Sequence, residues 1–423
     1  MKPVTVAIMG AGQRGLDAYA DYALRNPGEM KVVAVAEPIA QRREEAARLH
    51  DIDPSQVFTT WEDLLAKDQM ADAAFVCTQD KEHFHPARIA LEKGYHVLVE
   101  KPMSPDPLEC LEMGRLSEKH GRILSVCHVL RYSPFFKNVK EIIDSGAIGD
   151  IACIQHIENV GYWHQAHSFV RGNWRNSDET SPMILAKSCH DMDIINWLAG
   201  KKCVSVSSFG SLSYFKPQNA PEGATKRCLD GCAAIGSCPY SAKKIYLDSK
   251  GSFGDMVRRI ICGETGLDAA KKAVEEGPYG RCVFFCDNNV VDRQVVNLQF
   301  EEGLAASFTM CGFTGKGGRD INVMGTKGQI LGNMEEQTIE IYDFLTDERT
   351  SVGLSKSTLD SGHFGSDDAM MSAFVRQLRG FEEGKTSAAV SVESHLIAMA
   401  AEKSRVSGKT VNLDEFRAEV GKA

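Results

Sequence analysis

Residues 4–15 read VTVAIMGAGQRG, an apolar strand pattern that runs into a G-x-G-x-x-G loop and opens a helix pattern. Gly10 permits the tight turn, Gly12 lets phosphates approach the backbone, and Gly15 allows the helix to pack closely on the strand. Glu37 then ends the next apolar segment, 22 residues after Gly15. Because the free N–H groups at a helix start attract phosphate, the stretch predicts a dinucleotide-binding loop.

The residues around this loop bear on the choice between NAD and NADP. A carboxylate at Glu37 accepts hydrogen bonds from ribose hydroxyls and repels a 2′-phosphate. Arg42 or Arg43 can instead read a 2′-phosphate, so NADP stays an alternative to the expected NAD. Gln13 and Arg14 lie within the loop and are expected to face the dinucleotide.

The first 128 residues alternate strand-like and helix-like patterns. The strand patterns lie at Val4–Met9, Lys31–Ala36, Ala73–Cys77, His96–Val99 and Ile123–Val126. Such alternation predicts a parallel sheet with covered faces. Residues 1–128 are therefore expected to form a Rossmann domain in an α/β protein.

Beyond residue 128 the pattern changes to strands separated by short turns, which predicts a large, open and mostly antiparallel sheet. These strand patterns lie at Ile151–Glu158, Lys202–Ser213, Arg293–Phe300, Leu304–Met310, Ile321–Met324, Gln329–Gly332 and Thr338–Tyr342. Residues 129–385 are expected to form an α+β domain that binds substrate and mediates assembly, followed by a helical tail at 386–423. An uncovered sheet face predicts a homodimer or homotetramer.

The amino-acid composition narrows the possible classes of protein. The chain has 423 residues, of which 43% are hydrophobic and 25% charged, as expected for two globular domains. It contains no run of about 18 apolar residues, and its start lacks the pattern of a signal peptide. A net charge of −9 argues against nucleic-acid and anionic-membrane partners. Thirteen cysteines in such a chain are expected to be mostly reduced, in the cytoplasm.

Residues 216–292 interrupt the second domain as a lobe rich in Gly, Cys and Lys, with little periodicity and few apolar anchors. Cys228, Cys232 and Cys238 fall within eleven residues, and Cys282 and Cys286 return at the far end. The first three and one of the last two, with Cys282 preferred, can form a four-thiolate structural zinc site. Such a metal would explain how the lobe holds together, and reduced cysteines without metal are the alternative.

A second motif, Glu100-Lys101-Pro102, follows a later strand pattern. E-K-P behind a G-x-G-x-x-G loop resembles the Gfo/Idh/MocA oxidoreductases, the glucose–fructose oxidoreductase and inositol dehydrogenase family. The resemblance extends over nearly the whole chain except 216–292. It rests also on Thr78-Gln79-Asp80-Lys81-Glu82-His83 (the family's T-P-N-x-x-H, with Gln79 for proline), Arg131-Tyr132, His190-Asp191-Met192-Asp193 (H-D-x-D) and Gly325-Thr326-Lys327-Gly328 (G-T-x-G).

The resemblance has one departure. Many members carry an aspartate four residues before the histidine, whereas this chain has Ala186, followed by Lys187. The family's Lys/Asp/His trio is therefore incomplete. Lys187 lies three residues before His190, so on a helical turn both side chains would share a face. Either Lys187 or Tyr132 is expected to replace the missing carboxylate.

The family resemblance and the requirements of hydride transfer together assign roles. The hydroxyl proton must leave and the alkoxide must be stabilised. Lys101 is expected to bind the hydroxyl and share its proton, and His190 to act as acid, base or hydrogen-bond donor. The second part of the cofactor pocket is expected to comprise Thr78, Gln79, His83, Glu100 and Lys101. The substrate is expected to contact Arg131, Tyr132, Trp163, His164, Trp174, Lys187, His190 and His363.

Three functions follow from this assignment. The leading hypothesis is an NAD-dependent enzyme that moves hydride between nicotinamide and a secondary hydroxyl of a sugar, glycoside or cyclitol. The second is a redox-neutral enzyme with tightly bound NAD, which oxidises transiently and then eliminates, cleaves, isomerises or epimerises. The third is a non-catalytic NAD-binding protein, which the presence of both Lys101 and His190 disfavours.

Overall fold

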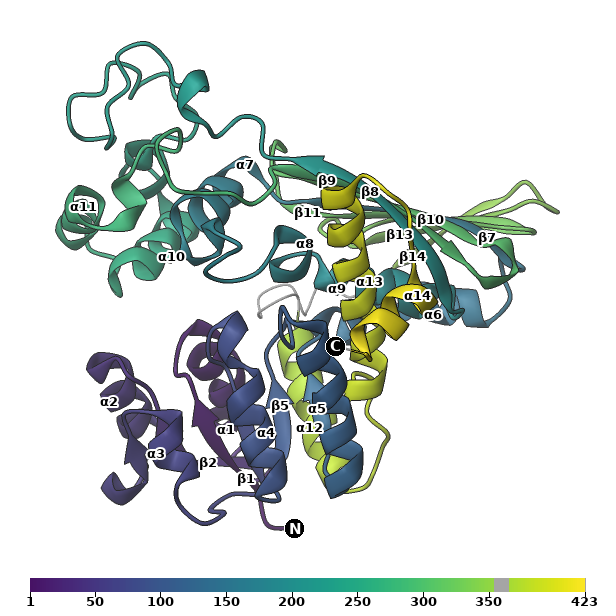
Figure 1. Cartoon of the computed structure of the whole chain (residues 1–423), viewed down its shortest axis with the longest axis horizontal. Helices are drawn as coiled ribbons and strands as arrows, with labels where there is room; N and C mark the ends of the chain where they lie inside the picture. The colour runs from purple at the N-terminus through teal and green to yellow at the C-terminus, as the bar shows by residue number, and fades with distance from the viewer. Residues whose placement is uncertain (354–364, 423) are drawn as a thin grey trace.

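The computed structural model describes residues 1–353 and 365–422, which form two domains and a lobe (Figure 1). The first domain contains a parallel six-stranded sheet in the order β3-β2-β1-β4-β5-β6. The strands are β1 (Val4–Met9), β2 (Met30–Ala36), β3 (Val57–Phe58), β4 (Ala73–Val76), β5 (His96–Val99) and β6 (Leu124–Val126). The predicted Rossmann fold is confirmed, and only the two-residue β3, too short to show a period, was not predicted.

Helices cover this sheet, and one of them comes from the far end of the chain. Phe374 of that helix, α12, packs edge-on against Phe75 of β4, with ring centroids 5.9 Å apart. The stretch predicted to close the second domain therefore includes a helix that lies on the first (Figure 1). The helices here are η1 (Gln13–Ala20), α1 (Asp21–Arg25), α2 (Ala40–Leu49), α3 (Trp61–Leu65), α4 (Phe84–Glu92), α5 (Pro107–His120) and α12 (Ser366–Leu378).

The second domain contains a nine-stranded sheet in the order β14-β13-β12-β11-β7-β10-β9-β8-β15. Its neighbours pair antiparallel except β7 and β10, which confirms the predicted open, mostly antiparallel sheet. The strands are β7 (Ile151–Asn159), β8 (Cys203–Ser211), β9 (Arg293–Phe300), β10 (Ala305–Cys311), β11 (Gly318–Gly325), β12 (Gly328–Asn333), β13 (Thr338–Asp343), β14 (Arg349–Gly353) and β15 (Val411–Asn412).

Helices pack against one face of this sheet, and the buried side chains of β7 lie on that face. Along β7 the alternation buries Ile154, His156 and Glu158, so two ionisable groups face the helices. The other face leaves Phe209 and Val295 exposed. The helices that contact this sheet are α6 (Pro134–Asp144), α9 (Cys189–Ala199), α13 (Ala388–Ser407) and α14 (Leu413–Val420), while the short α7 (Tyr162–His164) and α8 (Met183–Ala186) contact other helical segments.

The lobe lies between β8 and β9 and includes α10 (Gly251–Cys262) and α11 (Leu267–Glu276) (Figure 1). Its apolar side chains form a buried cluster together with Ala166 and Val170, which precede β8 in the chain. The lobe contributes Phe215, Cys228, Tyr240, Ala242, Ile245, Tyr246, Val257, Val274, Cys282, Val283 and Phe284. The expectation that the lobe has few apolar anchors is therefore wrong. Its core is assembled from scattered residues that follow no single helical or strand period, which is why the sequence pattern did not reveal it.

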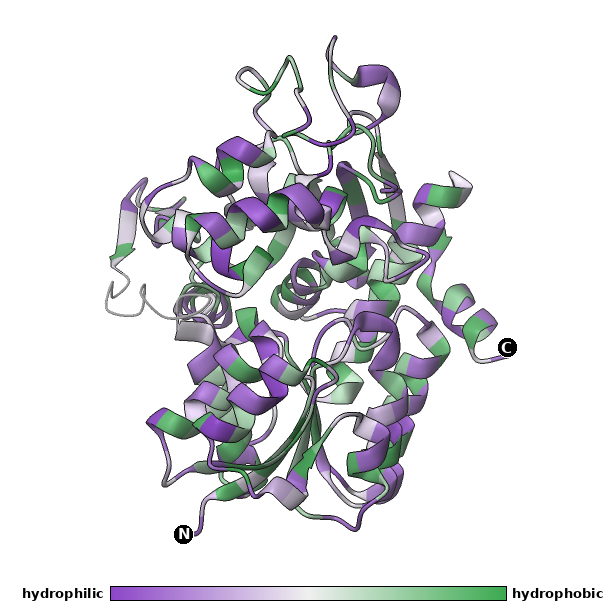
Figure 2. Ribbon diagram, turned by 90° about the vertical axis from the view of Figure 1, so that its left-hand side faces the viewer, coloured by the Kyte–Doolittle hydropathy of each residue, from purple (hydrophilic) through white to green (hydrophobic). Residues whose placement is uncertain are grey.

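Figure 2 shows the hydrophobic strands of the Rossmann sheet enclosed by helices with hydrophilic outer sides. The buried strand residues include Val6, Ile8, Phe75 and Leu98. This burial on both faces matches a doubly covered parallel sheet. Among the described residues, no helix combines the length and apolarity needed to cross a bilayer.

Candidate active site

The glycine loop, Gly10–Gly15, has the form that a dinucleotide requires. Gly10 has φ of +97°, and a Cβ there would lie 2.4 Å from the Cys77 carbonyl oxygen. A Cβ on Gly15 would lie 2.0 Å from the Gly10 oxygen, whereas one on Gly12 would have its nearest neighbour, Arg42 Nη1, at 3.8 Å. The start of η1 carries no side-chain cap. The loop therefore leaves the backbone at Gly12 open to a pyrophosphate, and its chemistry fits the cofactor.

Glu37 lies buried at the end of β2, beside this loop. Its carboxylate accepts hydrogen bonds from the Ala11 N–H at 2.7 Å and the Ile39 N–H at 2.9 Å. Arg43 donates to the Glu37 carbonyl oxygen at 2.6 Å and so supports the backbone. Of the two arginines considered for NADP, the side chain nearest Gly12 is that of Arg42.

Arg14 ties the glycine loop to the E-K-P motif. Its Nε lies 2.9 Å from Glu100 Oε1, and its Nη2 lies 2.7 Å from Asp367 Oδ1 of α12. The Tyr19 hydroxyl also hydrogen-bonds to Glu100. Burial opposes ionisation of Glu100, but Arg14 and Lys101 hold its pKa below the usual value. Buried Glu100 and half-buried Arg14 thus form an ion pair beside the loop, and Gln13 lies exposed at the loop's edge.

The loops after β4 and β5 are joined through His83. Its Nδ1 lies 2.7 Å from the Pro102 oxygen and its Nε2 3.1 Å from the Thr78 oxygen. Thr78 donates its hydroxyl to the Glu82 oxygen at 3.1 Å, and Gln79 is exposed beside it. The structure therefore places His83 as a fully buried link between two carbonyls.

Lys101 follows β5, and its peptide bond to Pro102 is cis. Its Nζ donates a hydrogen bond to the Ala186 carbonyl oxygen at 3.0 Å. The position where the family has aspartate thus supplies a backbone acceptor, and the ammonium keeps two further hydrogens. His190 lies in the first turn of α9, 8% exposed, with its ring centroid 5.7 Å from that of buried His128.

Lys187 meets a carboxylate that the sequence patterns did not single out. Its Nζ lies 3.1 Å from Glu158 Oε1, and Glu158 Oε2 lies 2.6 Å from Arg319 Nη2. Arg319 Nε lies 2.7 Å from Asp191 Oδ1, which also contacts His156. Burial opposes ionisation of Asp191, but Arg319 and His156 hold its pKa well below the usual value. These five residues are called the carboxylate network below.

Arg131 and Tyr132 make their contacts outside the carboxylate network. Arg131 forms a two-point ion pair with Asp193, at 2.6 and 2.8 Å, in which both side chains are buried. The Tyr132 hydroxyl lies 3.4 Å from Thr386 Oγ1, and burial raises the pKa of Tyr132. Of the two candidates to replace the missing aspartate, Lys187 is the one that contacts a carboxylate, Glu158, and through Arg319 it is linked to Asp191 on the helix that carries His190.

The charges of Lys187 and Lys101 both act on His164. Burial lowers its pKa well below the usual value, and Lys187, His167 and Lys101 add to this shift. Its ring stacks on Phe169, with centroids 5.8 Å apart. His164 is therefore a neutral imidazole near pH 7.

The remaining predicted substrate residues are more dispersed. Trp174 donates from Nε1 to Asp80 Oδ1 at 3.2 Å, and so contacts the loop after β4. Trp163 packs edge-on against Phe253 of the lobe, with centroids 4.9 Å apart. His363 lies outside the described residues.

Sequence reasoning missed Glu158, Arg319 and His128. A signal for Glu158 existed, because the period of two along β7 places it on the same face as Ile154 and His156. Two ionisable residues on the buried face of a strand require partners. Their partner Arg319 lies on β11, which only the strand pairing brings next to β7.

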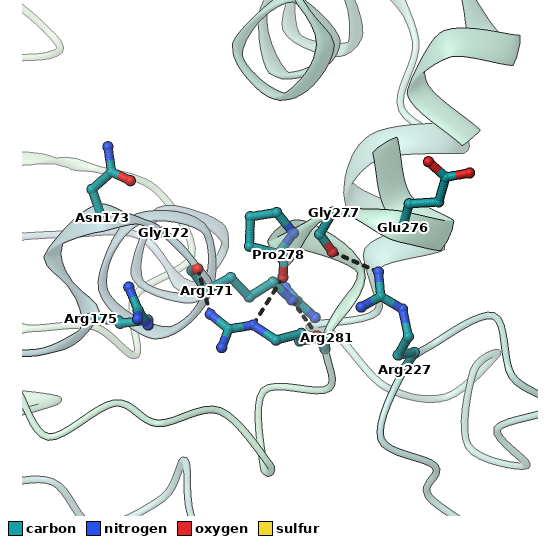
Figure 3. A pocket seen from close by; sticks show the side chains of 9 residues that line it. All are labelled: Arg171, Gly172, Asn173, Arg175, Arg227, Glu276, Gly277, Pro278 and Arg281. Atoms are coloured by element: carbon teal, nitrogen blue, oxygen red, sulfur yellow. Dashed lines mark hydrogen bonds between the residues drawn. The ribbon is translucent and has the colours of Figure 1, made fainter. Parts of the chain in front are cut away.

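A cavity of about 330 Å³ lies in and beside the lobe, lined by Arg171, Gly172, Asn173, Arg175, Arg227, Glu276, Gly277, Pro278 and Arg281 (Figure 3). Its guanidinium groups bond to the protein itself. Arg281 donates to the Arg171 oxygen at 3.0 Å, and Arg227 to the Gly277 oxygen at 2.6 Å. Because peptide carbonyls take up these donors, the cluster holds loops together and contains none of the residues around Lys101.

A Rossmann domain with an open phosphate loop, followed by an open-sheet domain whose helix brings His190 toward the loops, defines a two-domain, NAD-binding oxidoreductase. Two family models match the chain. "Oxidoreductase family, NAD-binding Rossmann fold" covers residues 4–128, and "Oxidoreductase family, C-terminal alpha/beta domain" covers residues 140–413. The chain belongs to the Gfo/Idh/MocA family of oxidoreductases.

Individual relatives match the chain at low sequence identity. The chain is 25% identical over 317 residues to the putative oxidoreductase YteT of Bacillus subtilis, covering 71% of each chain. It is 30% identical over 211 residues to inositol 2-dehydrogenase of Corynebacterium glutamicum, which is 48% of this chain and 57% of that protein.

Among solved structures, levoglucosan dehydrogenase in complex with NADH and levoglucosan has a TM-score of 0.72 at 17% identity, covering 97% of this chain and 100% of that one. An Agrobacterium radiobacter oxidoreductase in complex with NAD+, L-tartaric acid and magnesium has a TM-score of 0.71 at 15% identity, covering 98% and 99%. At these identities the likeness shows a shared fold.

Proposed function

We propose that the protein transfers hydride between nicotinamide and a secondary hydroxyl of a sugar, glycoside or cyclitol, with NAD preferred. The observation that carries the proposal is the hydrogen bond from Lys101 Nζ to the Ala186 oxygen at 3.0 Å. It ties a lysine at the carboxyl edge of the Rossmann sheet, where dinucleotide enzymes bind their ligands, to the segment that leads into His190.

In this mechanism the nicotinamide, when bound, supplies the hydride acceptor or donor. Lys101 holds the substrate oxygen with the hydrogens left after its bond to Ala186, and stabilises negative charge there. His190 receives the hydroxyl proton or returns it. Glu158 fixes the Lys187 ammonium, which then donates to a neighbouring substrate hydroxyl.

The substrate class is supported by two relatives and by the side chains at hand. One relative is named for inositol, and one solved structure contains levoglucosan; both molecules are polyhydroxylated rings. Trp174 and the stacked His164–Phe169 pair offer apolar faces for C–H groups, and Lys101 and Lys187 offer donors for hydroxyls. Free cysteines throughout the described residues support a reducing compartment such as the cytoplasm.

The test is a screen of cyclitols, aldoses and anhydrosugars with added NAD or NADP, followed at the nicotinamide absorbance. At least one polyol should reduce NAD, and Lys101→Ala should abolish that signal. Lys93→Ala is the matched control, because Lys93 Nζ only bonds the Lys67 oxygen in the same domain. A protein that binds NAD but turns over no polyol, with or without added nucleotide, would contradict the proposal.

A redox-neutral reaction on retained NAD is the second candidate, and a specific observation favours it. His164 is held neutral beside both lysines, and so can remove a C–H proton next to a transiently formed carbonyl. The assay uses protein without added nucleotide, in D₂O. Deuterium incorporated at carbon, lost in His164→Asn, supports this candidate, whereas net reduction of added NAD without exchange supports simple dehydrogenation.

A further inference from the structure

Four of the lobe's cysteines line one small cavity. Cys228, Cys232 and Cys238 come from the loop after β8, and Cys282 follows α11. The free volume is about 10 Å³, which is comparable to a single water molecule or ion. The backbone already clamps the two segments, since the Cys228 N–H donates to the Gly280 oxygen at 3.0 Å.

Three of the four sulfur atoms, those of Cys228, Cys238 and Cys282, receive backbone hydrogen bonds. Cys228 Sγ accepts from the Ala242 N–H at 3.4 Å. Cys238 and Cys282 each have a backbone hydrogen bond with the residue two positions further along the chain. N–H groups directed at sulfur stabilise a thiolate and orient it, as partners of a metal ligand do. A cysteine that only fills an apolar core has no need of such donors.

The same cavity is lined by a fully buried guanidinium. Arg171 is 1% exposed and donates to Cys228 Sγ at 3.8 Å, and to the Tyr240 and Arg281 oxygens at 2.7 Å each. Within residues 1–353 and 365–422, its hydrogen-bond partners are peptide carbonyls, the Cys228 thiol and the Tyr246 hydroxyl, and none is a carboxylate. A buried charge requires a counter-charge. A zinc ion with four thiolates carries a double negative charge and would supply it.

We propose that Cys228, Cys232, Cys238 and Cys282 bind one structural zinc ion, with Arg171 as the buried counter-charge. Binding releases four thiol protons to solvent and forms four Zn–S bonds, so no oxidant or reductant is needed. All thirteen cysteines are free thiols in the structure, and the described residues contain no His, Cys, Asp or Glu group already arranged to hold a metal. Zinc binding would therefore require the four thiols to turn toward the cavity that they line.

Cys286, the alternative fourth ligand, is placed differently. It does not line the cavity, and its Sγ donates to the Cys282 oxygen at 3.3 Å. Because the lobe has a hydrophobic core, the zinc would fix the cysteine loop against the segment after α11 rather than create the lobe's fold.

The experiment is elemental analysis of protein produced in zinc-supplemented medium and purified without chelators. We expect one zinc per chain in the wild type, in Cys286→Ser and in Cys262→Ser, and less than about a tenth of that in Cys282→Ser. Cys262 is a lobe cysteine whose Sγ bonds only backbone oxygens. Loss of metal in Cys286→Ser with retention in Cys282→Ser would overturn the ligand set.

If Cys282→Ser does not fold, the wild type still decides the question. Cobalt exchanged for zinc should give thiolate charge-transfer absorbance of a tetrahedral four-sulfur site. A chelator should make four additional thiols reactive toward a disulfide reagent. A folded wild type that binds neither zinc nor cobalt would refute the proposal. Neither readout uses enzymatic turnover, so this outcome is independent of the proposed reaction.

Discussion

The cofactor edge of the Rossmann sheet takes its functional groups from short motifs, whereas the substrate side takes them from β7, α8, α9 and β11. Gly10, Gly12 and Gly15 lie in one loop, and Lys101 directly follows a strand. The carboxylate network instead joins Glu158 to Arg319 across two paired strands. The motifs at the cofactor edge are thus local in sequence, although the ion pairs of Arg14 with Glu100 and Asp367 join distant parts of the chain there. On the proposed substrate side, the groups themselves are brought together only by long-range folding.

The largest effect is expected for Lys101→Ala, which tests the group at the cofactor edge that is placed by a short motif. We expect turnover to fall about 10²- to 10⁴-fold, the usual effect of losing a positioned proton-transfer group, which is roughly 3 to 5 kcal/mol of barrier. Affinity for NAD should change little, because the glycine loop and Glu37 are the groups proposed to hold the other end of the dinucleotide. Stopped-flow hydride transfer with a deuterated substrate, together with NAD titration by fluorescence, measures both effects. Turnover within about threefold of wild type would show that Lys101 does not act on the reacting oxygen.

Asp193→Asn tests whether the long-range pairs serve stability. Removing one partner of a buried ion pair costs about 3 kcal/mol or more of unfolding free energy, and Asp193 is buried against Arg131. Burial opposes ionisation of Asp193, but His128 and Arg131 lower its pKa below 3.8. Its contribution is therefore present above pH 4 and is lost as the pH falls toward the folded-state pKa.

Urea unfolding at pH 7 and near pH 3 measures this effect. The difference between wild type and Asp193→Asn should be large at pH 7 and smaller in acid. Asp144→Asn, in an exposed pair with Lys140, should change stability by less than about 0.5 kcal/mol. A difference for Asp193→Asn that does not vary with pH would show that its charge is not the cause.

Particular residues show which parts of the fold and of the candidate site can be predicted from the sequence alone. The strand and turn patterns predicted both sheets, and the glycine spacing predicted the phosphate loop, because each depends on residues close together in the chain. Lys101 was singled out by the family resemblance of E-K-P and by its place after a strand pattern. The ion pair of Lys187 with Glu158 could not be predicted, because it depends on how α8 sits over β7. Likewise, Arg131 was expected at the substrate, yet the structure pairs it with Asp193. The sequence around Arg131 does not indicate which carboxylate its long side chain reaches after folding.

Glu158→Gln is expected to have a smaller, mixed effect. The amide keeps the shape but leaves Lys187 and Arg319 without their shared charge, so kcat/KM should fall roughly 10- to 100-fold, about 1.4 to 2.7 kcal/mol. If Glu158 only supports the fold, unfolding free energy will fall while kcat/KM at low temperature stays near wild type. The neighbouring exposed Gln155→Ala on the same strand is the control. This variant decides whether the carboxylate network belongs to the chemistry or to the scaffold.

The smallest expected effect concerns cofactor choice at the glycine loop. Arg42 Nη1 lies nearest to where a Gly12 side chain would be, so Arg42→Ala should weaken NADP binding about fivefold and NAD binding less, since an exposed charge contributes only about 1 kcal/mol. Arg43→Ala should not discriminate between the two, because Arg43 bonds the Glu37 backbone. Fluorescence titration of both nucleotides against all three proteins makes the measurement. NADP binding that is equal to or tighter than NAD binding in the wild type would remove Glu37 as the selecting residue and assign that role to Arg42. The choice of cofactor would then depend on a side chain outside the motif formed by the glycine loop and Glu37.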